Sequence, residues 1–407
     1  MRPSLKLFRE LAAAVGLLTL LLWAAPCPAA KDTLTEVRLP EALAPGIHHL
    51  LSLVEPPQTA IFQPAEIASV LAFVRDSKPE ATLFYADSPA ELTSAFHEFD
   101  IACSLAHVLR YAYNPDVPGY LLTPSSIHYS SWSEVNGRPQ PLPRLWEVAL
   151  APGEFHLVRG VEQIEITPDL FTGAYYRYAN DKLLILCHHE GRRVLISLSK
   201  QQKPSDIGKR GMVLGRDAEW DYFYSGQPGL DKPGLGWVKS HMYDSLALMV
   251  YYEMDPETPL LRCATFKWLR AGWANINFVQ KNHIYRGLER FGKDFKELLE
   301  TPLLPETDEV SRVTAGFKDL SMNALRETAR NHFTNLQARY GRDNDTLDAR
   351  IEAVLTDDSY LNHMNREELE AILVKAYLKC LLGKKPGPGT PGGFCREITH
   401  RVPRNPE

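Results

Sequence analysis

The chain has 407 residues, of which 44% are hydrophobic and 10% aromatic, and 45 Lys and Arg stand against 50 Asp and Glu for a formal net charge of −5. This apolar content is enough for packed cores, so the composition excludes an intrinsically disordered chain. The sequence has no basic block and no stripe of basic and aromatic residues, which argues against a nucleic acid as partner. The length suggests two or three domains of about 150 residues each.

The first 30 residues are typical of a secretory signal peptide. Three basic residues precede the uncharged run LAAAVGLLTLLLWAA, and small residues follow it. The run is shorter than the ~20 residues of a membrane-spanning helix, so we expect cleavage after Ala29. An uncleaved N-terminal anchor and lipidation of Cys27 are the alternatives. We therefore expect an exported protein, periplasmic or extracellular, whose mature chain has no transmembrane span and a net charge of −7.

Residues 31–142 mix helical and extended patterns, which predicts a mixed α/β region. Apolar residues recur at helical spacing over 64–76, where a proline opens the stretch. A strand is expected at 81–87. A second helix is predicted over 100–113.

Cys103 and His107 would lie one turn apart on that second helix, so their side chains could meet. Such a pair can act as nucleophile and base. A single cysteine is more often a small buried hydrophobic residue, and ordinary packing is the favoured interpretation.

Residues 143–300 predict an antiparallel β domain. Short apolar or alternating runs follow one another, with turn signals such as Asn180–Asp181 and Glu190–Gly191 between them, and short connections favour antiparallel pairing. No long helix interrupts the runs, so a parallel doubly wound sheet is not expected. The predicted strands are LWEVAL, FHLVRG, EQIEIT, GAYYRYA, KLLILCH, RVLISLS, WDYFYSG, SLALMVYYEM and LLRCATFKWL.

A long amphipathic helix is predicted after these strands, over about 274–300. It would pack across the sheet and cover its apolar face. We therefore expect an α+β fold whose central β-rich domain is a barrel, a sandwich or a helix-grip-like arrangement. In architecture it resembles helix-grip ligand-binding folds.

Aromatic residues crowd the predicted β domain. In strands, most such side chains form core or cross-strand pairs. The alternative is a cavity lined by aromatic rings and a few phenolic hydroxyl groups, suited to a lipid-like or sugar-like ligand. The candidate ligand-binding residues are Tyr176, Tyr178, Trp220, Tyr222, Tyr224, Trp237, Tyr243 and Tyr251.

The segment Cys187–His188–His189–Glu190 gathers potential metal ligands and a potential nucleophile. Adjacent residues of a strand point to opposite faces, so both histidines cannot reach one metal while the strand stays regular. No metal-ligand spacing supports a site, and a hairpin tip with Cys187 buried at its base is the favoured interpretation. We expect no metal and no cofactor.

Residues 301–383 predict a small helical region, in which Asn365 and Glu368 form a capping box. Residues 384–407 form a Gly/Pro-rich tail. Tandem helices of this kind more often pack or bind a partner than catalyse, and contact with an envelope protein is expected here.

Export would permit disulfide bonds. A bond between Cys380 and Cys395 would close a loop of about 15 residues and staple the tail. Cys187 and Cys263 lie in strand-like runs, where each can be a buried thiol or the two can pair across strands. The pairing of these two residues and of Cys103 stays open.

The sequence has no recognised catalytic signature, neither a G-x-S-x-G elbow nor H-E-x-x-H nor a phosphate-binding glycine pattern. This favours an exported protein that binds a hydrophobic or amphipathic small ligand in the aromatic-rich β domain. A second hypothesis is an envelope hydrolase or transferase that uses His188 or His189 with Glu190, Asp221 or Asp244 around the same cavity. A third is a structural envelope component without a pocket.

Overall fold

The computed structural model describes residues 36–78, 83–86, 91–167, 172–213, 219–228, 230–232, 236–255, 257–340 and 359–384. The expected signal peptide and the Gly/Pro-rich tail beyond residue 384 lie outside these ranges. Residues from Glu36 onward belong to one unit.

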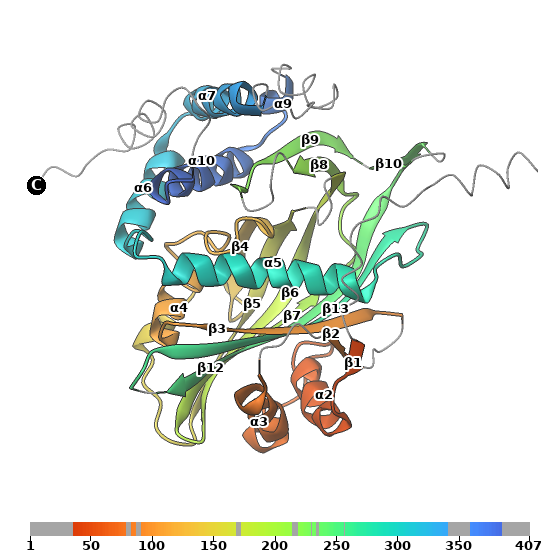
Figure 1. Ribbon diagram of the computed structural model, residues 1–407, viewed down its shortest axis with the longest axis vertical. Coiled ribbons are helices and arrows are strands. Elements are labelled where there is room, and N and C mark those ends of the chain that lie inside the picture. The colour runs from red at the N-terminus through yellow and green to blue at the C-terminus, as the bar shows by residue number, and fades with distance from the viewer. Residues whose placement is uncertain are drawn as a thin grey trace, which may run out of the picture. The chain divides into compact units, whose positions relative to one another are not determined.

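One sheet organises this unit, in the strand order β1-β2-β3-β13-β12-β7-β6-β5-β4, with β8 and β9 attached to β6 (Figure 1). β1 and β2 are parallel, and the other described pairs are antiparallel. The strands are β1 (Glu36–Arg38), β2 (Leu83–Tyr85), β3 (Thr93–Ile101), β4 (Ile127–Val135), β5 (Phe155–Ile166), β6 (Thr172–His189), β7 (Arg192–Gln201), β8 (Lys209–Val213), β9 (Tyr222–Pro228), β12 (Ser240–Asp255) and β13 (Leu260–Trp273). A separate hairpin joins β10 (Leu230–Lys232) and β11 (Gly236–Val238).

The expected α+β fold with an antiparallel sheet is confirmed. Within the described ranges the two ends of the sheet, β1 and β4, do not pair, so the sheet is unclosed and the barrel form is wrong. β3, from the N-terminal mixed region, pairs with β13, which lies late in the predicted β domain. The sheet therefore draws its strands from both regions.

The helices are α2 (Ala44–Ser52), α3 (Ala68–Asp76), α4 (Leu105–Ala112), α5 (Lys281–Glu300), α6 (Thr307–Asp319), α7 (Met322–Tyr340), α9 (Ser359–Asn362) and α10 (Arg366–Leu381). Short 3-10 turns, η1 (Glu41–Leu43), η2 (Pro64–Ile67) and η3 (Leu145–Glu147), complete the elements. None of the helices in the described ranges combines the length and the apolarity needed to cross a bilayer.

Alternation along β7 shows how the sequence builds two faces. Val194, Ile196 and Leu198 are fully buried in one core, to which α2 and α3 contribute. Leu195 faces the opposite core, to which α4 and α5 contribute. Successive strand residues point to opposite faces. A shift of the register by one residue would therefore move each of these side chains into the wrong core, which fixes the register of the strand.

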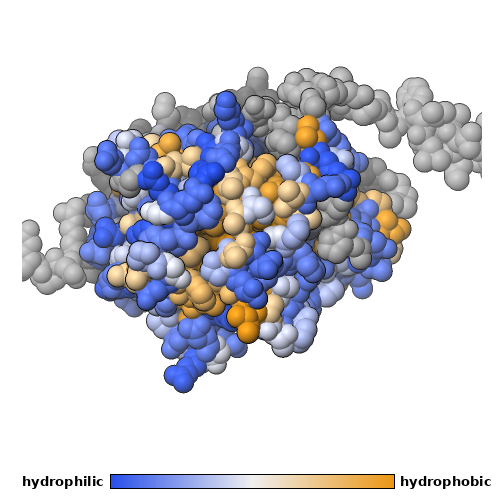
Figure 2. All heavy atoms as spheres, turned by 90° about the horizontal axis from the view of Figure 1, so that it is seen from below, coloured by the Kyte–Doolittle hydropathy of each residue, from blue (hydrophilic) through white to orange (hydrophobic). Residues whose placement is uncertain are grey.

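Figure 1 shows α2 and α3 on one side of the sheet and α5 on the other. α5 packs against β3 and β13. Its Gly292 allows this close approach, because a Cβ there would lie 2.8 Å from the ring of Phe99 on β3. Seen from the end that carries α2 and α3, the surface interleaves apolar with hydrophilic residues (Figure 2).

The tip of the β6–β7 hairpin confirms the predicted turn. Glu190 and Gly191 have φ angles of 49° and 77° and connect His189 to its partner Arg192. Positive φ at both central residues is the geometry of the two-residue hairpin turn that matches the twist of a sheet.

Two other local predictions are wrong. β6 runs without interruption through Asn180 and Asp181, because both residues pair with β5 on one side and β7 on the other. The segment LWEVAL is not a strand: residues 145–147 form η3 and the rest is irregular. The burial of its residues alternates although the segment lies outside the sheet, and Leu145 is the one residue of the segment that is buried.

The C-terminal helices attach to the sheet through α10. The predicted capping box is confirmed, since the Asn365 side chain accepts from the backbone N–H of Glu368 and the Glu368 carboxylate accepts from that of Asn365. Lys209 on β8 donates to Glu368, and Lys379 on α10 donates to Asp221 just before β9. The carboxylates of Glu368 and Asp221 are buried and need such partners, so these pairs set the position of α10.

Candidate functional site

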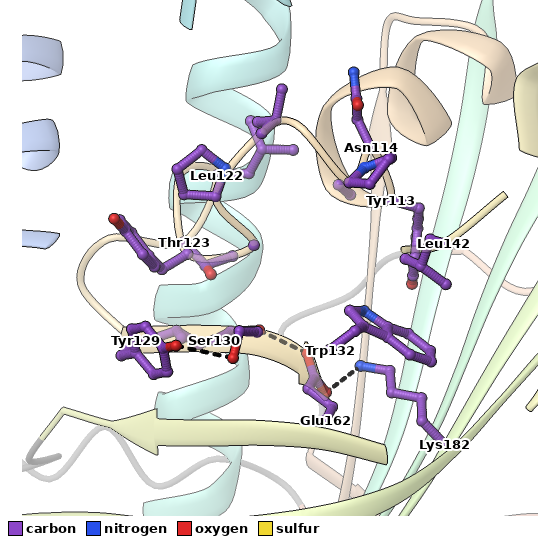
Figure 3. Close-up of a pocket in the computed structure, with 18 of the residues that line it drawn as sticks. Tyr113, Asn114, Leu122, Thr123, Tyr129, Ser130, Trp132, Leu142, Glu162 and Lys182 are labelled. Carbon is purple, nitrogen blue, oxygen red and sulfur yellow. Dashed lines mark hydrogen bonds and ion pairs between the residues drawn. The ribbon is translucent and has the colours of Figure 1, made fainter. Parts of the chain in front are cut away.

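A pocket of about 820 Å³ lies between α5 and the face of the sheet opposite α2 and α3 (Figure 3). Its walls come from strands β4, β5, β6, β7 and β12, from α5, and from the segment that follows α4; α6 and α10 form part of the rim. Small-molecule sites in proteins typically occupy ~300–1,000 Å³, so this pocket can hold a ligand of ordinary size.

One wall of the pocket is aromatic. α5 contributes Phe291 and Phe295, and Tyr251 on β12 lies beside Phe295 with 5.9 Å between ring centroids. Tyr113 meets the ring of Tyr251 edge to face at 6.3 Å. These rings provide rigid apolar surface at which a ligand would lose contact with water.

The floor is polar and comes from three neighbouring strands. Lys182 on β6 donates to Glu162 Oε2 on β5 at 2.6 Å, and the Ser130 hydroxyl on β4 donates to Glu162 Oε1 at 2.7 Å (Figure 3). The side chains of Lys182 and Glu162 are 16% and 8% exposed. Burial by itself lowers the pKa of Lys182, but the Glu162 carboxylate outweighs it, so the pKa is raised and the ammonium group stays charged.

Two serine hydroxyl groups extend this floor along β7. Ser199 lies directly opposite Lys182, and Ser197 lies opposite Leu184, with both serines lining the pocket. Neither hydroxyl is hydrogen-bonded to another residue in the part of the chain that the structure describes. They therefore remain available to a ligand or to water.

Trp132 on β4 reaches over the floor because β5 has a glycine beneath it. A Cβ at Gly160 would lie 2.8 Å from Cζ3 of the indole, and Gly160 is itself directly opposite Lys182. The indole ring lies 5.8 Å from the Lys182 ammonium group. An aromatic face, a cation and a carboxylate thus meet at one end of the pocket.

The rim of the pocket carries charged residues, and Arg366 and Glu370 are paired with each other. Arg366 on α10 donates to Glu370 at 3.1 Å and to the backbone oxygen of Lys318 on α6 at 3.0 Å. These contacts hold the ends of α6 and α10 together at the edge of the pocket.

The structure places the predicted aromatic residues in several different environments. Tyr251 lines the pocket. Trp220 and Tyr222 are buried in the same core, and their polar atoms serve internal hydrogen bonds, from Trp220 Nε1 to Asp294 at 3.3 Å and from the Tyr222 hydroxyl to the backbone oxygen of Ser125 at 2.8 Å.

Tyr176 and Tyr178 belong to a small separate cluster with Ile164 and Met242. Tyr243 packs under Arg270 at 4.9 Å, away from the pocket lining. The side chains of Tyr224 and Trp237 lie outside the described part of the structure. Ligand contact by these residues stays a prediction.

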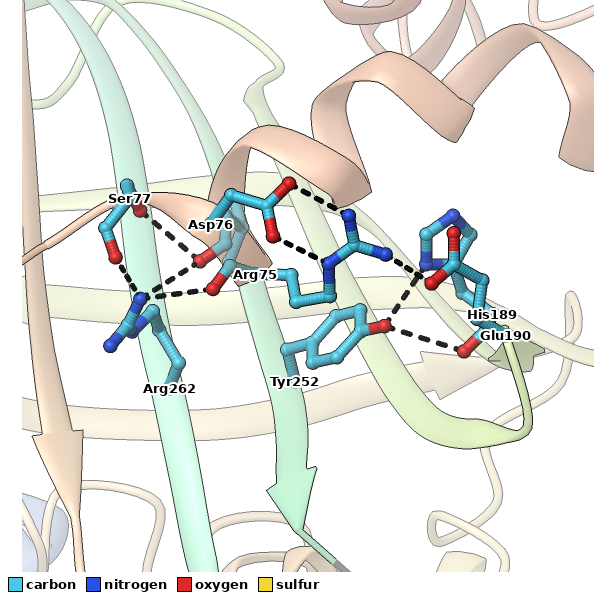
Figure 4. A network of polar contacts seen from close by, with 8 residues as sticks. Arg75, Asp76, Ser77, His189, Glu190, Tyr252 and Arg262 are labelled. Atoms are coloured by element: carbon cyan, nitrogen blue, oxygen red, sulfur yellow. Dashed lines mark hydrogen bonds and ion pairs between the residues drawn. The ribbon is translucent and has the colours of Figure 1, made fainter.

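The Cys187–Glu190 segment serves the fold. His189 Nδ1 lies 3.0 Å from the Tyr252 hydroxyl, and Arg75 at the end of α3 donates to Glu190 (Figure 4). The hairpin tip is thereby tied to α3. His188 follows Cys187, which is buried on the α2–α3 side, and so faces away from His189.

The residues of the hydrolase hypothesis do not converge. Asp221 pairs with Lys379, and Asp244 pairs with Lys200. Asp244 and Tyr252, the partner of His189, are eight positions apart on β12, a distance of about 26 Å at ~3.3 Å per residue. Across the described ranges, no group of three or more His, Cys, Asp or Glu side chains could hold a metal ion.

The cysteines in the described strands and loops are buried thiols. Cys103 precedes the N-cap of α4, so it does not share a helix face with His107, and burial raises its pKa to about 12. Cys187 and Cys263 lie in cores on opposite faces of the sheet and are free, which excludes a bond between them. Cys380 is half-buried on α10, and its predicted partner lies outside the described residues, so that disulfide stays a prediction.

Sequence reasoning missed a buried polar cluster behind the pocket. Asp294 on α5 accepts from the backbone N–H of Ser125 at 3.0 Å, and Lys375 on α10 donates to the backbone oxygens of Pro124 at 2.9 Å and Ile127 at 2.7 Å. Burial raises the pKa of Asp294 and lowers that of Lys375 to about 7. The cluster holds the loop before β4, because it supplies partners to that loop's backbone groups. A lone lysine within the apolar run LEAILVKAYL was the signal for it.

No protein-family model and no curated protein matches this chain. Among solved structures, a chain of the human StarD13 (DLC2) lipid transfer and protein localization domain is similar over 58% of this chain and 100% of that chain, with 10% sequence identity and a TM-score of 0.25. A likeness at this TM-score carries no argument about the function or the fold of the present chain.

Proposed function

We propose that this protein binds an amphipathic small molecule in the pocket between the sheet and α5. The observation that supports this proposal is that one cavity of about 820 Å³ has two unlike walls. Aromatic rings form one wall, and a row of serine, glutamate and lysine side chains forms the floor. A ligand with an apolar body and a polar end would match both.

The energetics favour such a ligand over a purely polar one. Each Å² of apolar surface removed from water contributes about 25 cal/mol, so contact with the rings of Phe291, Phe295 and Tyr251 supplies the affinity. A polar end can then hydrogen-bond to the floor, where the hydroxyl groups of Ser197 and Ser199 have no partner among the described residues. Glu162 and Lys182 already bind each other, which suits recognition better than proton transfer.

Blocking the pocket tests the proposal. Ser199→Trp fills the floor from β7, whereas Lys200→Trp places the same side chain on the opposite face of the strand. We expect the neutral fluorescent probe N-phenyl-1-naphthylamine to bind the wild-type protein saturably at one site. Ser199→Trp should weaken this binding about tenfold or more, which is ~1.4 kcal/mol, and Lys200→Trp should leave it nearly unchanged.

Both variants must first give cooperative thermal unfolding, which shows that they are folded. Equal probe affinity in the wild-type protein and in Ser199→Trp would contradict the proposed site. The absence of saturable binding to the wild-type protein would contradict the proposed function.

We also propose that the protein works outside the cytoplasm. The basic start, short apolar run and small residues at positions 1–30 support this. N-terminal sequencing of the protein from fractionated cells tests it: a mature chain that begins at Ala30 is expected, and an intact Met1 in the cytoplasmic fraction would contradict export. Contact between the C-terminal helices and an envelope protein stays a prediction.

A further inference from the structure

The floor of the pocket has more hydrogen-bonding capacity than its own residues use. An ammonium group has three donors and a carboxylate about four acceptor positions. One donor of Lys182 goes to Glu162, and Glu162 accepts from Lys182 and Ser130. Ser197 and Ser199 add hydroxyl groups that are unpaired within the described ranges. The floor can therefore both donate to a ligand and accept from it.

The charges of the pocket select against an ionic ligand. On the floor, the ammonium group of Lys182 and the carboxylate of Glu162 are 2.6 Å apart and cancel. An anion that reaches Lys182 meets the repulsion of Glu162, and a cation that reaches Glu162 meets that of Lys182. The rim of the pocket also carries charges of both signs, from Asp116, Lys318, Arg366, Glu367 and Glu370. An uncharged hydroxyl group can donate to the carboxylate and accept from the ammonium group without this cost.

Trp132 adds a shape requirement. Its indole lies across Gly160 and beside Lys182, so a group bound to the floor has an aromatic face against it. A saturated sugar ring presents C–H groups on its faces and hydroxyl groups around its edge. Such a ring can pack on an indole and hydrogen-bond at its edge at the same time.

We propose that the polar end of this pocket recognises an uncharged polyhydroxyl group of the hexopyranose type. Its hydroxyl groups bridge Glu162 and Lys182, and its ring face lies against Trp132. The apolar part of the same ligand lies along Phe291 and Phe295. This inference rests on the proposed function and specifies the chemistry of its ligand.

Three amphiphiles with the same chain and different head groups test the inference. Octyl β-D-glucoside, octyl sulfate and octyltrimethylammonium are titrated into the full-length protein below their micelle concentrations and followed by calorimetry. We expect the glucoside to bind about tenfold or more tightly than either ion, a difference of ~1.4 kcal/mol.

Variants then assign the selectivity to the floor. Lys182→Met and the paired substitution Ser197→Ala with Ser199→Ala should each reduce glucoside binding about tenfold. The matched control is Lys200→Met, which removes another lysine paired with a carboxylate, on the opposite face of the sheet. It should change neither glucoside binding nor N-phenyl-1-naphthylamine binding. If Lys182→Met does not fold, the variant with both Ser197→Ala and Ser199→Ala still tests the inference.

The outcomes separate the two proposals. Equal binding of the three amphiphiles, or tighter binding of an ion, overturns the polyhydroxyl inference while the probe still supports ligand binding. Loss of selectivity in Lys200→Met as well as in Lys182→Met also overturns it. Failure of the naphthylamine and all three amphiphiles to bind overturns the proposed function and the inference with it.

Discussion

The indole ring of Trp132 lies over Gly160, so that a Cβ on Gly160 would come within 2.8 Å of the indole and 2.2 Å of the backbone oxygen of Glu134. The backbone of β4 cannot move away without breaking its pairing with β5. Gly160→Ala should therefore destabilise the protein by about 1–3 kcal/mol, as overpacking of a filled site does.

Urea denaturation measures this change in the free energy of unfolding. Binding of N-phenyl-1-naphthylamine to Gly160→Ala shows whether Trp132 has moved. Trp132→Ala in the Gly160→Ala background should recover part of the loss, because it removes the contact with the ring and leaves the one with the Glu134 oxygen. A Gly160→Ala variant as stable as the wild-type protein would show that β5 is not packed in this way.

Lys375 predicts a particular dependence of stability on pH. Burial lowers its pKa to about 7 from the usual 10.5, although Asp294 and Glu165 act in the opposite direction. At a pH between these two pKa values, Lys375 carries a proton in the unfolded chain that it lacks in the folded chain. The free energy of unfolding should therefore gain a contribution that rises with pH from about 7 to about 10.5, and that no longer changes below 7.

The variant Lys375→Met removes this contribution. Its slope of unfolding free energy between pH 7.5 and pH 9.5 should be smaller than that of the wild-type protein, by up to ~1.4 kcal/mol per pH unit. The variant is also less stable overall, because the backbone oxygens of Pro124 and Ile127 lose their donor. Identical slopes in urea denaturation would mean that Lys375 keeps an ordinary pKa.

Arg262 and Glu190 belong to one polar network but should differ in importance (Figure 4). Arg262 is 7% exposed, binds Asp100 with two donors at 2.8 and 3.0 Å, and donates to backbone oxygens at the end of α3. Arg262→Met leaves these acceptors unpaired and should cost about 3 kcal/mol. Glu190→Gln removes only an exposed ion pair and should change stability little.

Chemical denaturation of the two variants side by side measures the difference. Arg262→Lys is the conservative control, and it should recover only part of the loss because an ammonium group cannot bind a carboxylate with a planar fork. Equal costs for Glu190→Gln and Arg262→Met would contradict this description of the network.

The histidine pair should not bind zinc. His189 lies beside Tyr252, whereas His188 faces the other side of the sheet. Elemental analysis of protein purified without chelators should find clearly less than one zinc per chain, and a chelator should leave the thermal midpoint unchanged. One tightly bound zinc per chain, lost in His188→Ala, would contradict this.

The sequence predicted those features that depend on local chemistry. Glu190–Gly191 was recognisable as a turn because the glycine tolerates positive φ, and Asn365 with Glu368 as a capping box because both residues serve the same helix end. The segment RVLISLS was predicted as a strand, and it forms β7. The turn predicted at Asn180–Asp181 was wrong. These residues favour turns locally, but their pairing with strands on both sides overrides that preference.

The candidate site could not be predicted in the same way. Ser130, Glu162, Lys182 and Ser199 come from four strands and meet only through the strand order and register of the sheet. One signal was available: in VLISLS, serines occupy alternate positions of an otherwise apolar strand, which marks a face that is polar where a core would be apolar. The aromatic residues gave a weaker signal, because strands favour them whether or not a cavity is present.

The most direct test of the proposed binding function is native mass spectrometry of the wild-type protein purified from its own cells, followed by organic extraction. We expect a small molecule bound at one per chain, with an apolar part and an uncharged polyhydroxyl part, that is absent from Ser199→Trp and retained by Lys200→Trp. Wild-type protein that carries no small molecule, and that takes up none when incubated with a lipid extract of the same cells, would contradict the proposal.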